Sequence, residues 1–87
     1  MPRFDISTEY LVRFLQDLVN TPSPTGDTDW AISFVEAELE SLGIHSVRTT
    51  KGALIAYDDG LRNDKPRALT AHVDTLGAMV SEIKDNG

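Results

Sequence analysis

His72 and Asp74 are the residues of this 87-residue sequence whose types and spacing could carry chemistry. They stand two positions apart after an apolar run, and side chains at i and i+2 of a strand point to the same face. The Asp74 carboxylate could therefore hold one imidazole nitrogen of His72 while the other nitrogen faces a metal ion, which fixes the tautomer of the ligand. The alternative is a strand end with a hydrogen-bonded histidine and a turn aspartate. For an isolated H-x-D motif this structural interpretation is the commoner one.

The composition excludes several other kinds of chemistry. Acidic residues outnumber basic ones, 14 to 8, and the formal net charge of −6 argues against a nucleic-acid partner. The sequence has no cysteine, which excludes disulfides and thiolate metal sites and fits a reducing compartment. No apolar run approaches the roughly 20 residues that span a bilayer, and the N-terminus has no signal-peptide pattern. These features predict a cytoplasmic protein without a membrane partner.

An amphipathic helix is predicted at the start of the chain. Ser7 is a good N-cap residue, and Pro22 disfavours helical geometry in the residue before it, so the helix should end near Asn20. The apolar face of this helix comprises Leu11, Phe14, Leu15, Leu18 and Val19. The segment 21–26, T-P-S-P-T-G, is too rich in proline and glycine for regular structure and is interpreted as a stiff connector.

A second helix follows the connector. Asp27 or Thr28 should cap its N-terminus, and Gly43 is well placed as the residue that follows its C-terminal cap. Its apolar stripe comprises Ala31, Phe34, Val35, Leu39 and Leu42. Its charged residues Glu36, Glu38 and Glu40 are expected to face solvent.

The rest of the sequence predicts short strands. They comprise residues 44–49, 53–57, 67–73 and 78–84, with a turn at Lys51-Gly52 and a polar loop over 58–66. The third strand is nearly continuously apolar, which indicates burial on both faces. His45 is expected to be a surface residue. The fold class is therefore predicted to be α/β, with two N-terminal helices packed on the start of a mixed β-sheet.

The order of these features resembles the opening segment of a known enzyme family. T-P-S-P-T-G, the helix end E-L-E-S-L-G and the stretch A-L-T-A-H-V-D-T-L-G-A-M-V resemble the tetrahedral, glutamyl-type aminopeptidases, family forty-two of the clan MH metallopeptidases. The H-x-D-x-x-G turn is the most specific part, and T-L-G-A-M-V is most similar to a branch associated with osmoprotectant peptides. The resemblance covers essentially all of residues 1–87.

The resemblance implies a function and assigns roles to two residues. It implies a homo-oligomeric aminopeptidase that acts on peptides with two divalent ions, usually zinc and sometimes cobalt or manganese. It makes His72 a metal ligand and Asp74 the catalytic-site aspartate that orients this histidine. Residues 1–87 would then be a partial zinc-peptidase catalytic domain, namely its N-terminal portion. The other metal ligands, the general base and an inserted dimerisation domain would lie later in the parent protein. The chain alone is accordingly expected to be inactive.

Two alternatives stay open beside this interpretation. Another clan MH enzyme, a deacylase or a carboxypeptidase, could use the same H-x-D turn, although such relatives more often have a proline after the turn where this sequence has Gly77. A non-catalytic binding or assembly module that kept the fold without the chemistry is the third possibility.

Overall fold

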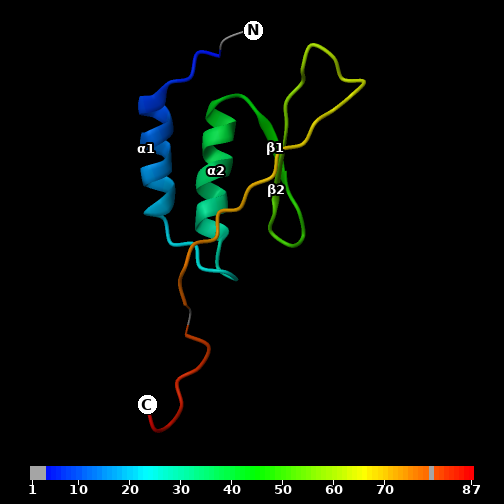
Figure 1. Cartoon of the computed structure of the whole chain (residues 1–87). Helices are drawn as coiled ribbons and strands as arrows, with labels where there is room; N and C mark the ends of the chain where they lie inside the picture. The colour runs from blue at the N-terminus through cyan, green and yellow to red at the C-terminus, as the bar shows by residue number, and fades with distance from the viewer. Residues whose placement is uncertain (1–3, 79) are drawn as a thin grey trace.

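Two antiparallel helices lie beside a two-stranded sheet in the computed structural model, which describes residues 4–78 and 80–87 (Figure 1). The elements are α1 (Thr8–Val19), α2 (Asp29–Ser41), β1 (His45–Arg48) and β2 (Leu54–Tyr57). Helix α2 lies in the middle, in contact with α1 on one side and with both strands on the other. The predicted α/β class with two N-terminal helices is thereby confirmed.

Helix α1 begins and ends where its local signals predict. The Ser7 side chain accepts a hydrogen bond from the backbone N–H of Tyr10, which satisfies one of the free donors of the first turn. The helix ends at Val19, with Asn20 as its C-cap residue. Its contact with α2 is aromatic, because the ring of Phe14 stacks on that of Phe34 with 5.2 Å between the ring centres.

Helix α2 has Leu42 as its C-cap residue, and Gly43 follows this cap, as predicted. Gly43 has a φ of +76°, a conformation that glycine adopts without the steric cost of a side chain. The N–H of Gly43 donates to the carbonyl of Glu40 and the N–H of Ile44 donates to that of Leu39, which is the Schellman pattern. At the other end Thr28 is the N-cap residue, but its side chain makes no capping hydrogen bond.

The buried and exposed residues of α2 differ in part from the predicted ones. Ile32, which the stripe omitted, is buried with Ala31, whereas Leu42 at the end of the stripe is exposed. The carboxylate of Glu36 accepts a hydrogen bond from Arg48 of β1, and that of Glu38 accepts one from the Tyr10 hydroxyl. Glu36 and Glu38 thus link the helix to β1 and α1, whereas Glu40 is exposed as predicted.

Strands β1 and β2 form an antiparallel hairpin close to the predicted boundaries. Val47 pairs with Ile55, and the other pairs keep the same register. The turn is closed by a 2.8 Å hydrogen bond from the Thr49 N–H to the Ala53 carbonyl, and Gly52 within it has a φ of +92°. The turn predicted at Lys51-Gly52 is therefore confirmed.

The third and fourth predicted strands are not formed. The described residues of 67–73 and 78–84 carry no strand assignment, and Met79 lies outside the described residues. Leu69, predicted to be buried on a two-sided sheet, is fully exposed. A strand requires a hydrogen-bonded neighbour. The pairing that the described chain offers this region is an isolated parallel bridge between Pro24 and Thr75.

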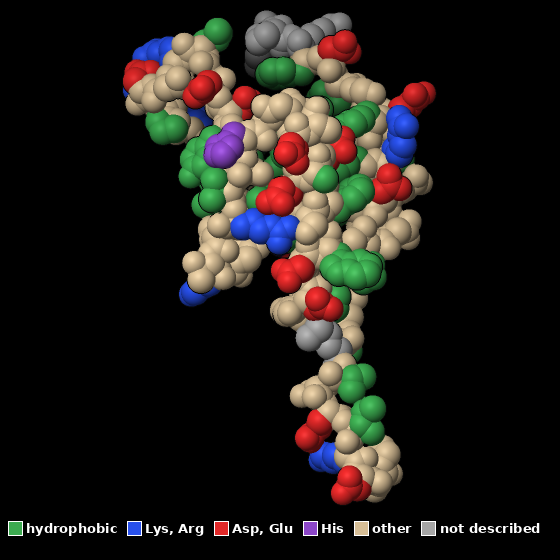
Figure 2. Space-filling view, turned by 180° about the vertical axis from the view of Figure 1, so that it is seen from behind, with side chains coloured by type: hydrophobic (Ala, Val, Ile, Leu, Met, Phe, Trp, Pro, Cys, Tyr) green, Lys and Arg blue, Asp and Glu red, His purple; other side chains and the backbone are tan. Residues whose placement is uncertain are grey.

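The molecule is elongated, because its C-terminal segment projects away from the helices and the hairpin (Figures 1 and 2). The radius of gyration is 17.1 Å, where a compact chain of this length would have about 12 Å. The buried core is small, and many large apolar side chains are exposed on the body and on the projecting segment. Within the described ranges, neither helix is long and apolar enough to cross a membrane.

Candidate metal-binding turn

The segment that carries His72 and Asp74 returns from the polar loop and ends against the connector between the helices (Figure 1). The backbone N–H of Thr75 donates a 2.7 Å hydrogen bond to the Ser23 carbonyl, and the Thr75 hydroxyl lies 3.3 Å from the same oxygen. Ser23 is only 1% exposed, so this contact is shielded from solvent. The connector and the H-x-D turn are thus one local structure.

Gly77 permits this approach. A Cβ atom at this position would lie 3.0 Å from the Cβ of Pro24, closer than real Cβ contacts normally come. Gly77 is not among the described glycines with positive φ, so a left-handed backbone conformation is not the reason for a glycine here. The requirement is therefore the close packing of the connector.

His72 and Asp74 are in contact, as their spacing predicts. The Nδ1 atom of His72 lies 2.8 Å from Oδ1 of Asp74. A carboxylate in this position accepts the proton of Nδ1–H and leaves Nε2 as the nitrogen with a free lone pair. The His72 side chain is 83% exposed, so the ring is accessible from solvent. The contact forms without the predicted strand.

The second carboxylate oxygen of Asp74 has a partner of its own, Thr25, which the sequence pattern does not reveal. The Thr25 hydroxyl donates to Oδ2 of Asp74 over 3.2 Å. The hydrogen bond from Thr25, followed by that from His72, lowers the pKa of Asp74 below its ordinary value of 3.8. Asp74 is therefore an ionised acceptor at neutral pH. No local signal could have identified Thr25, because 49 positions separate it from Asp74.

The donor chemistry of the turn fits one position of a metal site. An imidazole whose tautomer is set by a carboxylate is a common ligand of zinc and related ions. Within residues 4–78 and 80–87, however, no group of three or more histidine, aspartate or glutamate side chains could hold a metal ion together. In the described part of the chain, His72 and Asp74 thus form a hydrogen-bonded pair with no third side chain of this kind placed to share a metal ion with them.

A pocket of about 400 Å³ lies beside the turn. It lies between residues 71–74 on one side and α2 and β2 on the other. Its walls are mainly apolar on the helix and hairpin side, with His72 and Asp74 on the other. The lining residues on α2 are Ile32, Val35 and Leu39, and those on β2 are Leu54 and Ala56.

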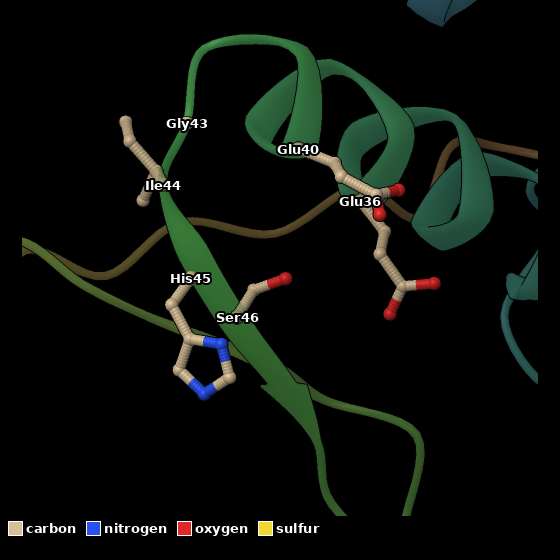
Figure 3. Close-up of a pocket in the computed structure, with 6 residues that line it drawn as sticks. All are labelled: Glu36, Glu40, Gly43, Ile44, His45 and Ser46. Carbon is tan, nitrogen blue, oxygen red and sulfur yellow. The ribbon is translucent and has the colours of Figure 1, made fainter.

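A second pocket, between α2 and β1, offers no comparable arrangement (Figure 3). Glu36 and Glu40 project from α2 into it, but the His45 ring points away from both carboxylates. His45 is exposed at the start of β1, as predicted for a surface residue. The two carboxylates and this histidine therefore do not converge on one point.

Comparison with known proteins agrees with the family that the motifs resemble. Residues 52–87, which include the H-x-D turn, match the family model described as M42 glutamyl aminopeptidase. The chain is 46% identical over 81 residues to a Bacillus subtilis protein that carries the provisional name aminopeptidase YhfE. No solved structure matches the chain at a significant level.

Archaeal relatives carry a different, equally provisional name, LysW-lysine/LysW-ornithine hydrolase. The chain is 38% identical over 83 residues to the Thermococcus kodakarensis protein and 31% identical over 77 residues to that of Pyrococcus abyssi. The alignment with the Bacillus subtilis protein covers 93% of this chain and 23% of that protein. The corresponding shares are 94% and 23% for the Thermococcus kodakarensis protein, and 87% and 22% for the Pyrococcus abyssi protein. The chain thus spans about a quarter of the length of these proteins. The predicted resemblance is confirmed: this chain is similar to the M42 glutamyl aminopeptidases and matches their family model over residues 52–87.

Proposed function

We propose that this chain is the N-terminal portion of the catalytic domain of a metal-dependent aminopeptidase. The hydrogen bond between His72 and Asp74 carries the proposal, because it lies within the residues that match the family model and has the form of an oriented metal ligand. The family description and the relatives' names support the broader class, a peptidase-type hydrolase. The aminopeptidase activity is the finer proposal.

His72 and Asp74 would have different roles at the metal: His72 binds the ion, and Asp74 orients His72. Asp74 accepts a hydrogen bond from Nδ1–H of His72 and so selects the tautomer in which the lone pair of Nε2 is free to bind an ion. When bound, a pair of divalent ions supplies a water of lowered pKa and polarises the scissile carbonyl. Hydrogen bonds from Thr25 and His72 hold both oxygens of the Asp74 carboxylate and lower its pKa, which favours its role as an acceptor.

The further features of the family extend the proposal. The ions are zinc, with cobalt or manganese as substitutes, and the substrates are peptides with a free N-terminus. The enzyme is a homo-oligomer that acts in the cytoplasm. Neither a nucleic acid nor a membrane is part of its activity, which is consistent with the net charge of −6.

A second candidate function comes from the names of the archaeal relatives. A hydrolase of the LysW-lysine/LysW-ornithine type is supported by 38% and 31% identity, against 46% for the relative named as an aminopeptidase. Both functions would use the same His72–Asp74 pair. They differ in substrate, so a substrate panel separates them.

Hydrolysis by the full-length protein that carries this chain tests the proposal. The panel comprises aminoacyl chromogenic substrates, N-acyl amino acids, peptides cleaved from the C-terminus, and LysW carrying lysine, each with zinc, cobalt or manganese. We expect metal-dependent release of N-terminal residues that is lost with chelator and in His72→Ala. His45→Ala is the matched control, because it removes an exposed histidine outside the turn and should keep activity. Absence of N-terminal release with every metal, or full activity of His72→Ala, would contradict the proposal.

A further inference from the structure

We propose that Thr25 is a positioning residue for the metal ligand His72 and that it acts through Asp74; this inference rests on the function proposed above. The Thr25 hydroxyl donates to Oδ2 of Asp74, while Oδ1 of the same carboxylate lies 2.8 Å from Nδ1 of His72. The carboxylate is thus held at both oxygens. Its plane, and with it the direction in which it accepts the imidazole proton, is defined by Thr25.

Thr25 is itself held in place by the connector. The N–H of Asp27 donates a 2.9 Å hydrogen bond to the Pro24 carbonyl, which closes a four-residue turn with Thr25 at its second position. Gly26 at the third position has a φ of +91°, as type II turns require. Pro24 has a fixed φ of about −65°, which further limits the freedom of this turn. The hydroxyl is therefore presented from a rigid base.

The connector is in turn attached to the segment that carries Asp74. The Ser23 carbonyl accepts the N–H of Thr75, the residue directly after Asp74, over 2.7 Å. The turn that begins at Pro24 thus places Thr25, and the backbone bridge at Thr75 places Asp74. Because the backbone already positions both residues, little conformational entropy is lost when the Thr25 hydroxyl forms its hydrogen bond with Asp74.

A purely structural role is the competing explanation for this contact. The Thr25–Asp74 hydrogen bond is exposed, so it adds little to the overall stability of the fold. If the hydroxyl only tied the connector to the turn, its removal would leave the imidazole of His72 and the affinity for metal unchanged. If it orients the carboxylate, its removal alters the imidazole of His72 and the affinity for metal while the stability stays nearly constant.

Three threonine variants of the full-length protein separate these explanations. Thr25→Val keeps the shape of the side chain and removes the donor, whereas Thr25→Ser keeps the hydroxyl. Thr21→Val is the matched control, since the Thr21 hydroxyl lies in the same connector but donates to the Asp17 carbonyl. Zinc affinity is measured by competition with a chromophoric chelator. Thermal unfolding and the ¹⁵N chemical shifts of the His72 ring are recorded on the metal-free protein.

We expect Thr25→Val to bind zinc about 3- to 10-fold more weakly, less than the roughly 10- to 100-fold typical when the direct partner of a ligand is lost. Its ring nitrogens should shift toward a mixture of tautomers, with unfolding unchanged. Thr25→Ser and Thr21→Val should match the wild type in both readouts. The inference is overturned if Thr25→Val keeps wild-type ring shifts, or if Thr25→Ser is as impaired as Thr25→Val.

The ring shifts also keep the two proposals distinguishable. If the wild type binds no zinc, the proposed function fails, and the tautomer of His72 in the metal-free protein still decides the role of Thr25. If zinc binds and Thr25→Val leaves the ring unchanged, the proposed function stands and the positioning role is wrong.

Discussion

The backbone N–H of Thr75 donates a 2.7 Å hydrogen bond to the carbonyl oxygen of Ser23, and this bond joins two segments 52 positions apart in the sequence. It places the connector between the helices directly against the H-x-D turn. The connector therefore couples the helices to the candidate metal ligand. Its packing is close, since a Cβ atom at Gly77 would lie 3.0 Å from the Cβ of Pro24.

Gly77→Ala should weaken this contact region. The added methyl would meet the rigid Pro24 ring at 3.0 Å, and overpacking of this kind costs about 1–3 kcal/mol. The alanine side chain also lowers the conformational entropy of the unfolded chain, which stabilises the folded state by about 0.4–1 kcal/mol. The net expectation is that the free energy of unfolding falls by about 1 kcal/mol. Denaturant unfolding measures this change.

Gly60→Ala is the control for Gly77→Ala. A Cβ at Gly60 would have its nearest neighbour at 3.4 Å, an ordinary contact distance, so this variant carries the same unfolded-state effect without the clash. It should be as stable as the wild type or slightly more stable. If the two variants lose equal stability, the close packing against Pro24 is not the cause.

The signals that predicted the fold correctly are local ones. The Ser7 cap, the Gly43 cap and the Lys51-Gly52 turn each depend on residues within about six positions, and each is confirmed. Strand 67–73 was wrong because its apolar run indicates burial without identifying a hydrogen-bonded neighbour. The His72–Asp74 contact was predictable from i, i+2 spacing, whereas the Thr25–Asp74 contact depends on the tertiary fold.

The 87-residue chain should associate with itself. Helix α1 exposes apolar side chains beyond its contact with α2, namely Leu11, Val12, Leu15 and Val19. Exposed apolar faces of this kind favour association in water. We expect sedimentation velocity to show species larger than the monomer as the concentration rises.

A single charge on α1 should reduce this association. Leu15 is 52% exposed, so Leu15→Glu adds a charge to the apolar face without emptying a core position. Gln16→Glu adds the same charge at the neighbouring exposed position and should leave association nearly unchanged. A compact monomer at high concentration with a sharp unfolding transition would show that the wild-type chain needs no partner.

The 87-residue chain should have no peptidase activity of its own. Catalytic zinc sites usually have three protein ligands per ion, and the described residues hold no such group. We expect no hydrolysis of aminoacyl chromogenic substrates above blank with zinc, cobalt or manganese. Metal-dependent turnover that survives repurification and disappears in His72→Ala would contradict this prediction.

The Arg62–Asp64 pair of the polar loop gives a pH-dependent prediction outside the site. Two hydrogen bonds from the Arg62 guanidinium, 3.1 and 2.6 Å long, lower the pKa of Asp64 below its ordinary value of 3.8. Because the pKa is lower in the folded state, the pair stabilises the fold above about pH 4, and this contribution is lost as the pH falls through the folded-state pKa. It is small, because both side chains are exposed.

An NMR titration of the Asp64 carboxyl carbon measures this pKa directly. In Arg62→Gln the midpoint should rise toward the ordinary value, since the charged donor is removed. An unchanged midpoint in that variant would mean that Arg62 does not hold the carboxylate in solution.

The central claim, that His72 is a metal ligand supported by Asp74, is tested most directly by counting metal in the full-length protein. Bound ions are measured by elemental analysis after gel filtration, and their affinity by chelator competition, in the wild type, His72→Ala, Asp74→Asn and His45→Ala. We expect two divalent ions per subunit in the wild type and in His45→Ala. Asp74→Asn should bind about 10- to 100-fold more weakly, and His72→Ala more weakly still. Wild-type metal content and affinity in His72→Ala would contradict the claim.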